Sequence, residues 1–392
     1  MSKLGQRIAQ YWENIQGSLF PFLEEELDPL SQKQRQLIAV LELIRIEEHI
    51  PDYFWTGRPP SARTAIARAF VAKAVYNFST TEMLIDRLKS DKNFRRICGW
   101  ERKTDIPHKS TFSRDFTWFS KLKLPQLVHD ALIKTACAED IIGHTSYDST
   151  AIEAREKVKK YSDQYLQEQT EELELLAQKK GKRGRPKKGE IRIPKQEEPN
   201  RIDKQLSMSL PEMLGDLPKA CDIGCKKNSQ GYVEKWKGYK LHLASADGGI
   251  PLSAILTSAS VHDSQVAIPL MSLTAERAIN CYDLMDAAYD DERIKEYSRS
   301  LNHVPLIDEN PRRDVNRKNE IETEAKARKI LNFKMPEDIR YNERTTVERS
   351  NARLKDEFGA RTVRVKGDAK VMCHLMFGVL ALTADQLLRL IN

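Results

Sequence analysis

Four polar residues near the C-terminal end of the chain are spaced so that one face of a helix would present all of them. Tyr341 and Arg344 precede Glu348 by 7 and 4 residues, and Lys355 follows it by 7, in a strongly helix-forming segment. At about 100° per residue, the four side chains fall within roughly 60° of arc. A salt bridge between Arg344 and Glu348 would explain only two of them. A phosphate-processing site would use all four, because glutamate can hold a divalent metal ion, arginine and lysine bind phosphate oxygens, and tyrosine adds a stacking face.

Two further carboxylates occupy positions where a β-strand normally carries no charge. Asp148 lies in the alternating, β-friendly segment 144–154, and Asp286 ends a short apolar run. A charge in a strand is costly unless it binds something, and ligands gather at strand ends in open α/β sheets. Taken singly, each carboxylate is better explained as a solvated, inert group at a sheet edge. Asp308 is the alternative to Asp286, and Asp263 is expected to cap the helix that follows it.

The pattern Tyr-x2-Arg-x3-Glu-x6-Lys resembles the signature of a large group of bacterial insertion-sequence transposases of the DDE type, and every spacing of that signature is met. Other segments are similar to further blocks of the same family. These are residues 146–150 with the first aspartate, 238–242 and 261–264 in the middle, 284–290 with the second aspartate, and 94–99 with 107–112 in the N-terminal part. Ala287 and Ala288 stand where many members have a glycine. The resemblance covers most of residues 80–148 and 236–375.

The resemblance implies an α/β fold with a ribonuclease-H-like catalytic core, a helical N-terminal DNA-binding domain and a charged insertion. It also implies that Asp148, Asp286 and Glu348 are catalytic and hold two Mg²⁺ or Mn²⁺ ions. Carboxylates suit these hard cations, and two such ions can activate an attacking oxygen and stabilise a leaving one. The implied activity is that of a DNA transposase, which hydrolyses the phosphodiester at the transposon ends and joins the 3′-OH to target DNA.

The implied partner is double-stranded DNA, both the terminal inverted repeats and the target. Tyr341, Arg344 and Lys355 are expected to bind the terminal phosphates. A homodimer on DNA is expected, because two transposon ends must be brought together. Two other functions are alternatives: a metal-dependent DNA nuclease without strand transfer, and a non-enzymatic DNA-binding regulator. The regulator would leave the strand carboxylates and the helical face without a role.

Residues 1–140 are expected to form the helical N-terminal domain. Periodic apolar runs there follow hydroxyl residues that are typical helix caps, at Ser31, Ser61, Thr80 or Thr81, and Ser110. Residues 91–123 contain nine Lys/Arg against four Asp/Glu, interleaved with aromatic residues. This composition favours a helix-turn-helix DNA reader and an ordinary helical bundle with a basic face about equally.

The stretch 155–235 is expected to be a charged, flexible insertion between two parts of the catalytic domain, 141–154 and 236–392. Within it, residues 179–188 hold seven positive charges in ten positions. The centre of this run resembles an AT-hook, in which Arg183 and Arg185 enter an A·T-rich minor groove. A solvated charge run is the alternative explanation.

The rest of the catalytic domain alternates between strand and helix signals. Strands are expected at 238–244, 251–257, a segment ending at 286, and 304–307, with a turn at 247–249. Helices are expected after Asp263 and from Asp291, and the last eighty residues are expected to be helical. This order predicts a mixed α/β domain.

Composition excludes several other classes of protein. The 392 residues suggest two or three domains, and the net charge of +7 permits a polyanionic partner. The N-terminal segment is expected not to be a signal peptide, and the apolar segment 371–382 is expected to be a buried helix and not a membrane span. The six cysteines predict no disulfide framework and favour a cytoplasmic, nucleoid-associated protein. Cys221 and Cys225 could be half of a zinc site, but no second pair stands at a zinc-finger spacing.

Overall fold

The computed structural model describes residues 29–51, 62–137, 141–158, 200–227, 230–312 and 314–391. The first part of the chain forms α3 (Gln32–Ile44), α4 (Arg63–Val75), α5 (Thr81–Ser90), α6 (Lys92–Ile97), α7 (Lys109–Leu122) and α8 (Leu124–Cys137), with 3-10 turns η1 (Ile46–His49) and η2 (Lys103–Asp105). The strands are β1 (Ile141–Glu153), β2 (Asp222–Lys227), β3 (Val233–Ala246), β4 (Pro251–Ser258), β5 (Ile279–Met285) and β6 (Val304–Ile307). The helices around them are α10 (Arg201–Gln205), α11 (Leu210–Asp216), α12 (Ser264–Ala275), α13 (Glu292–Ser300), α14 (Val315–Ile330), α15 (Pro336–Tyr341), α16 (Thr345–Asp356) and α17 (Asp368–Ile391), with 3-10 turns η3 (Asp247–Gly249), η4 (Ala287–Tyr289) and η5 (Asn342–Arg344).

The strands form one mixed sheet in which β1 is central. β3 pairs with β1 in antiparallel fashion, β5 runs parallel to β1, and β6 runs parallel to β5. The far side of β3 is shared, because β2 pairs with its first half and β4 with its second half. The resulting order β4-β3-β1-β5-β6 is a mixed α/β arrangement consistent with a ribonuclease-H-like core.

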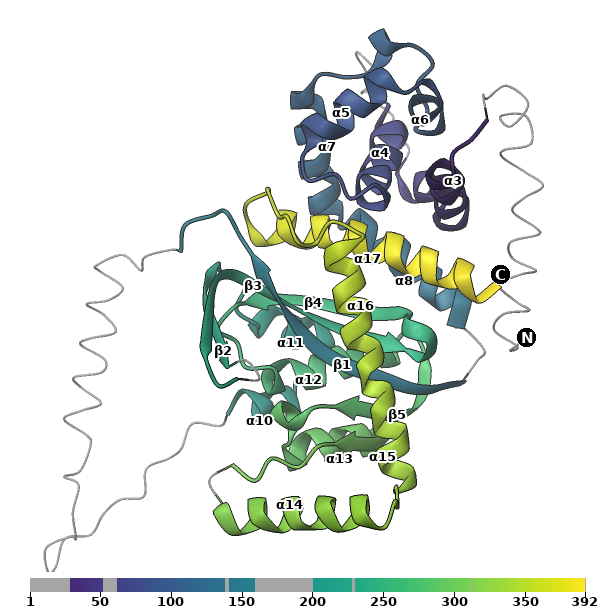
Figure 1. Ribbon diagram of the computed structural model, residues 1–392. Coiled ribbons are helices and arrows are strands. Elements are labelled where there is room, and N and C mark those ends of the chain that lie inside the picture. The colour runs from purple at the N-terminus through teal and green to yellow at the C-terminus, as the bar shows by residue number, and fades with distance from the viewer. Residues whose placement is uncertain are drawn as a thin grey trace, which may run out of the picture.

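Helices cover both faces of this sheet (Figure 1). Tyr147 and Ala244 point into a hydrophobic cluster that α12 dominates. Ile152, further along β1, and Leu243, which precedes Ala244 in β3, point the other way, into a larger cluster that includes α16 and α17. This alternation follows from the two-residue period of a strand. Since Asp148 pairs with Leu243, it belongs to the face that α16 covers.

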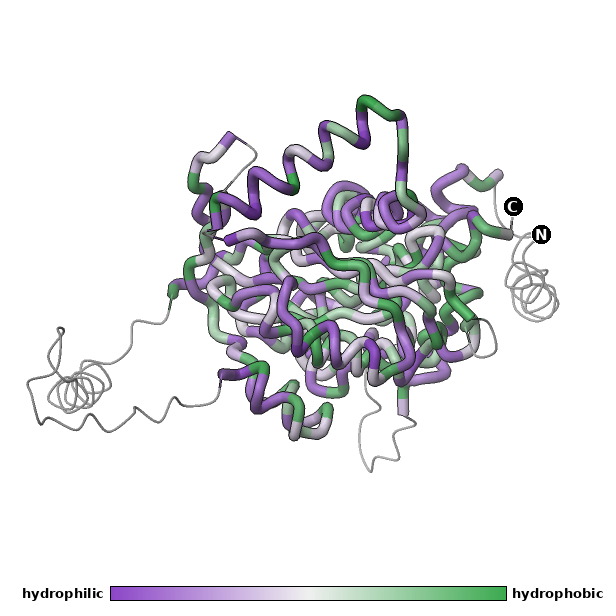
Figure 2. The backbone as a smooth tube through the Cα atoms, turned by 90° about the horizontal axis from the view of Figure 1, so that it is seen from below, coloured by the Kyte–Doolittle hydropathy of each residue, from purple (hydrophilic) through white to green (hydrophobic). Residues whose placement is uncertain are grey.

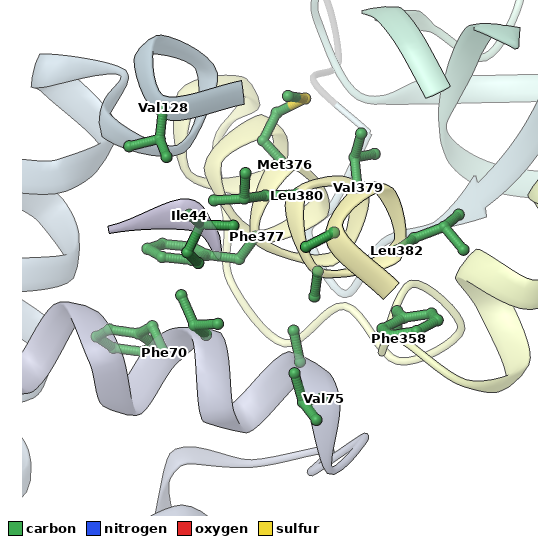
Figure 3. Packing of buried hydrophobic residues seen from close by; sticks show 14 of the residues in the cluster. Ile44, Phe70, Val75, Val128, Phe358, Met376, Phe377, Val379, Leu380 and Leu382 are labelled. Atoms are coloured by element: carbon green, nitrogen blue, oxygen red, sulfur yellow. The ribbon is translucent and has the colours of Figure 1, made fainter. Parts of the chain in front are cut away.

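The N-terminal helices pack on the core through α17 (Figure 3). Phe377 of α17 lies 5.7 Å from Phe70 of α4, measured between ring centroids, and Phe116 of α7 lies 4.9 Å from Phe70. Ile44 and Val128 add contacts from α3 and α8. One hydrophobic cluster therefore joins the N-terminal helices to the sheet face that carries Asp148.

Helix α17 is long and apolar enough by composition to cross a membrane, over Asp368–Leu390, but 78% of its most apolar window is buried inside the protein. This is the environment of a core helix, as the sequence predicts for residues 371–382. The opposite case is α14, in which no residue is buried. Seen from below, α14 stands away from the rest of the chain and is mainly hydrophilic (Figure 2).

Several element boundaries confirm the sequence predictions. Ser31 caps α3 in a reciprocal capping box with Gln34, and Thr80 caps α5 by accepting from the Met83 N–H. The turn at 247–249 and the strand at 304–307 are also where the sequence predicts them. By contrast, α7 begins at Lys109 with His108 as its cap residue, so the predicted cap Ser110 is wrong by two residues. The predicted cap Ser61 lies outside the described residues.

The stretch predicted to be a flexible insertion contains ordered structure at its C-terminal end. α10 and α11 pack against α12 through Ile202 and Met213, and β2 extends the sheet by pairing with β3. The prediction for 155–235 is therefore wrong for residues 201–227. It fails because helices of five and seven residues are too short to show a clear apolar period.

Candidate active site

The sheet brings Asp148 and Asp286 to the same level. The parallel ladder aligns Ser146 of β1 with Leu284 of β5. Two residues further along both chains, the next positions are Asp148 and Asp286. β5 ends at Met285, so Asp286 is the first residue beyond the strand, and its Oδ1 accepts a hydrogen bond from the Ala288 N–H at 2.9 Å.

Burial and nearby carboxylates disfavour the ionised forms of Asp148 and Asp286. Burial, together with the charges of Asp286 and Asp263, raises the pKa of Asp148 to about 6. Burial, with the charges of Asp263 and Asp308, also raises the pKa of Asp286. Like charges close together in a partly buried place have this effect, because each penalises the ionised form of the other. A cation between them would therefore be bound favourably.

Helix α16 lies against β1 and contacts Asp148 through a residue that sequence reasoning missed. Asn351 Nδ2 donates to Asp148 Oδ2 at 3.1 Å, and Asn351 is itself buried. Asn351 comes three residues after Glu348 and four before Lys355, so it belongs to the same helical face. That spacing is the signal that could have identified it; the residue went unnoticed because an amide does not titrate and the signature has no fixed residue there.

Glu348 lies on this face, but its carboxylate is turned to Arg344. Arg344 Nη2 donates to Glu348 Oε1 at 2.7 Å, and the Glu348 side chain is 49% exposed. Arg344 is also close enough to Asp286 to lower the pKa of that carboxyl group. In the part of the chain that the structure describes, no three His, Cys, Asp or Glu side chains are close enough together to hold a metal ion. The structure thus joins Asp148 with Asp286 and leaves the Glu348 carboxylate outside that pair.

The Glu348 carboxylate is kept from the aspartates by the orientation of its side chain, and not by the position of the α16 backbone. Asn351, one helical turn further on, already contacts Asp148, so the backbone of α16 is near the two aspartates. Rotation of the Glu348 side chain away from Arg344 requires no movement of the helix. The exposed ion pair that holds it is of a kind worth at most about 1 kcal/mol.

Tyr341 and Arg344 lie at the N-terminal end of this face. Tyr341 ends α15, and the 3-10 turn η5 connects it to α16, so the predicted continuous helix is tightened at this point. The Arg344 guanidinium lies 5.7 Å from the Tyr341 ring centroid. Burial and the neighbouring carboxylate of Asp308 raise the pKa of Tyr341, which therefore stays a hydrogen-bond donor at neutral pH.

Lys355 lies at the opposite end of the same face. Burial and the positive charges of Lys226 and Arg361 lower its pKa, while Asp148 acts in the opposite direction. Arg344, just before α16, and Lys355, in its last turn, therefore lie at opposite ends of the face that contacts Asp148. Cations arranged in this way suit a run of phosphates that passes through the carboxylate site.

The donor set fits a hard divalent cation. Besides the carboxylates, the Tyr289 hydroxyl and the Asn351 Oδ1 are buried and have no hydrogen-bond partner among the described residues. The Tyr289 hydroxyl is close to Asp148, Asp286 and Asp263, whose charges help to raise its pKa beyond the effect of burial. These are oxygen donors, which Mg²⁺ and Mn²⁺ prefer, and orphaned buried oxygens next to a carboxylate pair are a natural place for an ion with its bound waters.

Asp263 has a different role from the one predicted. It stands before α12, but its side chain makes no capping hydrogen bond. Instead it accepts from Lys240 Nζ at 2.9 Å and lies 3.9 Å from His242 Nδ1. Burial alone would raise the pKa of Asp263, but the charges of His242 and Lys240 outweigh it and lower the pKa. Asp263 is therefore a compensated charge at the rim of the site.

The other carboxylates near β5 are tied into the structure. Asp283 is fully buried and accepts from Tyr147 Oη at 3.0 Å and Ser298 Oγ at 2.6 Å. Asp290 pairs with Lys295 Nζ at 2.5 Å. Asp308, the predicted alternative to Asp286, follows β6, which is one strand further from β1 than β5 is, and it is close to Tyr341. The geometry thus favours Asp286 over these neighbours.

The site described above includes neither the predicted AT-hook arginines nor the cysteine pair. Arg183 and Arg185 lie outside the described residues, so their predicted contact with DNA stays a prediction. Cys221 is buried and Cys225 is exposed, and both are free thiols.

Comparison with known proteins defines the class to which this fold and site belong. A family model described as the transposase DDE domain matches residues 217–384, and a second one, described as a transposase domain (DUF772), matches residues 22–120. The first match contains Asp286 and the whole α16 face but begins after Asp148. No curated protein and no solved structure matches the chain.

The chain therefore belongs to the DDE transposases of insertion sequences, and its function is that of a DNA transposase. The two matches together cover about two thirds of the chain. β1, which carries Asp148, falls between them, so its connection to the site comes from the pairing of β1 with β5 and from Asn351.

Proposed function

We propose that Asp148, Asp286 and Glu348 are the catalytic residues of this transposase and hold two Mg²⁺ or Mn²⁺ ions. The observation that carries the proposal is the parallel pairing that sets Asp148 level with Asp286 beneath α16. Ions bound there would activate the attacking oxygen and stabilise the leaving 3′ oxygen of the cut strand. Glu348 reaches the ions by rotating away from Arg344.

The other residues on α16 position the protein and the DNA. Asn351 fixes the orientation of the Asp148 carboxylate through its hydrogen bond. Arg344 and Lys355 bind the phosphates on either side of the cleaved bond, Arg344 through two parallel hydrogen bonds and Lys355 as a point charge. Tyr341 donates to a phosphate or stacks on the terminal base. These contacts favour an in-line approach of the attacking oxygen.

The reaction then has two chemically similar steps. Water attacks the phosphodiester at the transposon end, the bond to the 3′ oxygen breaks, and that oxygen leaves as a 3′-OH. The same 3′-OH next attacks a phosphodiester in the target DNA and joins the transposon strand to it. Each step breaks one phosphodiester linkage, and the second also makes one, so no energy cofactor is needed.

The partners follow from these steps. The helical N-terminal domain binds the terminal inverted repeats, Arg183 and Arg185 contact an adjacent minor groove, and two chains act together as a homodimer on DNA. The protein works in the cytoplasm on the nucleoid. The basic, aromatic-rich segment 91–123 supports the role of the N-terminal helices.

A joining assay tests the proposal. Duplexes of the terminal inverted repeat, intact or already cut at the 3′ end, are incubated with the full-length protein, Mg²⁺ and a supercoiled target plasmid. Joined products are expected from the cut duplex. Nicks without joining would indicate a nuclease, and shifted bands without cleavage would indicate a regulator.

Matched substitutions connect the activity to the site. Asp148→Asn and Asp286→Asn should abolish cleavage and joining but leave duplex binding largely intact. Asp290→Asn is the control, because Asp290 is four residues from Asp286 but is paired with Lys295. Near-normal cleavage by either site variant, or equal loss in the control, would contradict the assignment.

A further inference from the structure

A second polar site lies at the junction of the N-terminal helices and the core. A cavity of about 340 Å³ opens between α4, the N-terminal ends of α5 and α7, the end of β1, and the segment before α17. Four cationic side chains line it: Lys73, Lys109, Arg155 and Arg364. They come from four separate segments of the chain, so no local sequence pattern reveals the cluster.

Lys73 is the residue that indicates a ligand. It lies in the last turn of the apolar helix α4 with only 8% of its surface exposed, and no hydrogen-bond or ion-pair partner is found for its side chain among the described residues. Burial lowers its pKa to about 8. A buried ammonium group without a partner is costly, and the cost is recovered when an anion enters the cavity that the group lines.

The rest of the lining is complementary to an anion. Arg155 and Arg364 are exposed at the rim, and no partner is found for either within the described ranges. Lys109 is paired with Glu82, the one carboxylate that lines the cavity. Thr80 and Thr81 bring the N-terminal end of the ten-residue helix α5 to the wall, where backbone N–H groups and the helix dipole favour negative charge.

His374 adds no charge to the cavity. Burial, with the nearby charge of Lys73, lowers its pKa to about 3, so it is neutral at pH 7. Its Nε2–H donates to the Gly359 carbonyl at 3.1 Å, which fixes the ring. The lining therefore carries four cations against a single carboxylate at neutral pH.

We propose that this cavity binds a backbone phosphate of the transposon-end duplex and thereby ties the N-terminal helices to the catalytic core on DNA. The inference adds a DNA contact to the transposase function, and it uses none of the residues assigned to catalysis. A phosphate is the anion of choice because lysine, arginine and a helix N-terminus together form its usual protein environment.

The position of the cavity explains why DNA is the source of the phosphate. Arg155 lies just beyond the end of β1, seven residues after Asp148 in the sequence. At about 3.3 Å per strand residue, the two are at most roughly 23 Å apart. This corresponds to roughly seven base pairs of duplex at 3.4 Å per base pair. A duplex whose end reaches Asp148 can therefore place a phosphate of its interior at the cavity.

Binding measurements with the full-length protein test the proposal. The probe is a labelled duplex of the terminal inverted repeat, titrated at several salt concentrations in EDTA so that no metal-dependent step runs. Lys73→Met keeps the length of the buried side chain and removes its charge. It should weaken binding about tenfold and lower the slope of log affinity against log salt by about one. Arg155→Gln and Arg364→Gln should each lower the slope in the same way.

The controls separate a phosphate contact from a structural role. Lys73→Met should leave the thermal midpoint unchanged or raise it, because the buried charge is lost. Lys326→Met removes an exposed charge from α14, which does not line the cavity, and should change the slope less than Lys73→Met does. Phosphate ethylation roughly seven base pairs from the cleaved end should weaken binding of the wild type but not weaken Lys73→Met further.

Three results would overturn the proposal. The first is an unchanged salt slope in Lys73→Met together with the two arginine variants. The second is an equal loss in Lys326→Met. The third is binding of inorganic phosphate that depends on Lys73 while duplex binding does not, which would indicate a free-phosphate site. Because the assay needs no catalysis, a failed joining assay would leave its result interpretable.

Discussion

We expect Asp148→Asn to make the metal-free protein more stable at pH 8. In the folded protein, burial and the carboxylates of Asp286 and Asp263 raise the pKa of Asp148 from 3.8 to about 6. A difference of roughly two pKa units corresponds to about 3 kcal/mol, at 1.36 kcal/mol per unit. Ionised Asp148 therefore costs the folded state about that much relative to the unfolded chain. Asparagine is nearly isosteric, and its Oδ1 can still accept from Asn351.

The pH dependence of this effect has a definite sign. Since the folded state holds the proton of Asp148 more tightly than the unfolded state, the associated stability is fully present below about pH 3.8. It is lost as the pH rises through about 6. The advantage of Asp148→Asn should therefore be absent near pH 4 and reach its full size above pH 7.

Urea denaturation in EDTA at a series of pH values measures the effect. The control is Asp283→Asn, the same change in the neighbouring strand. Asp283 accepts from Tyr147, Asn280 and Ser298, so its loss should destabilise the protein by about 2 kcal/mol or more. Adding Mg²⁺ should stabilise the wild type and not Asp148→Asn. Destabilisation by Asp148→Asn at pH 8, or a difference that does not vary with pH, would refute the reasoning.

Four further substitutions test α16 and Arg344, the residue just before it. Glu348→Gln should abolish cleavage and retain duplex binding, as measured by gel shift and cleavage of the same labelled duplex; substantial cleavage would remove Glu348 from the catalytic set. Asn351→Leu removes the donor to Asp148, so the acidic limb of the pH–rate profile should move to higher pH; a lower rate with an unmoved profile would mean that Asn351 serves packing alone. Lys355→Ala should weaken binding of the cut end and lower the salt slope by about one, and an unchanged slope would argue against a phosphate contact. Arg344→Gln should tighten Mn²⁺ binding in the absence of DNA, measured by calorimetry, because a competing cation is removed.

The parts of the fold that the sequence predicts well are those with local signals. The β3–β4 hairpin follows from the turn at 247–249, and Ser31 and Thr80 begin their helices because a hydroxyl can satisfy free N–H groups there. The joining of α10, α11 and β2 to the core could not be predicted, because these elements are short and gain their stability from packing on α12 and pairing with β3. These contacts join segments that are distant in the sequence, and no local sequence pattern indicates them.

The same distinction applies to the site. The helical spacing of Arg344, Glu348 and Lys355 is local, and the structure keeps these residues on the α16 side of the sheet. The alignment of Asp148 with Asp286 depends on strand register, which only the fold determines. The cavity around Lys73 is harder still to foresee, because in the sequence Lys73 is simply one polar residue within an apolar helix.

Arg344 connects the two halves of the candidate site. It donates to Glu348 and also acts on Asp286, so one guanidinium serves two carboxylates that are proposed to hold metal ions. If Glu348 turns to the ions, the same rotation frees the Arg344 guanidinium for a phosphate oxygen. One rotation of the Glu348 side chain would then both bring the third carboxylate to the ions and make the Arg344 guanidinium available to a phosphate. Both groups lose one partner and gain another, so the exchange costs little, and metal and DNA should bind with positive coupling. The spacing of four residues between arginine and glutamate makes this exchange possible, since at any other helical spacing except three they could not meet.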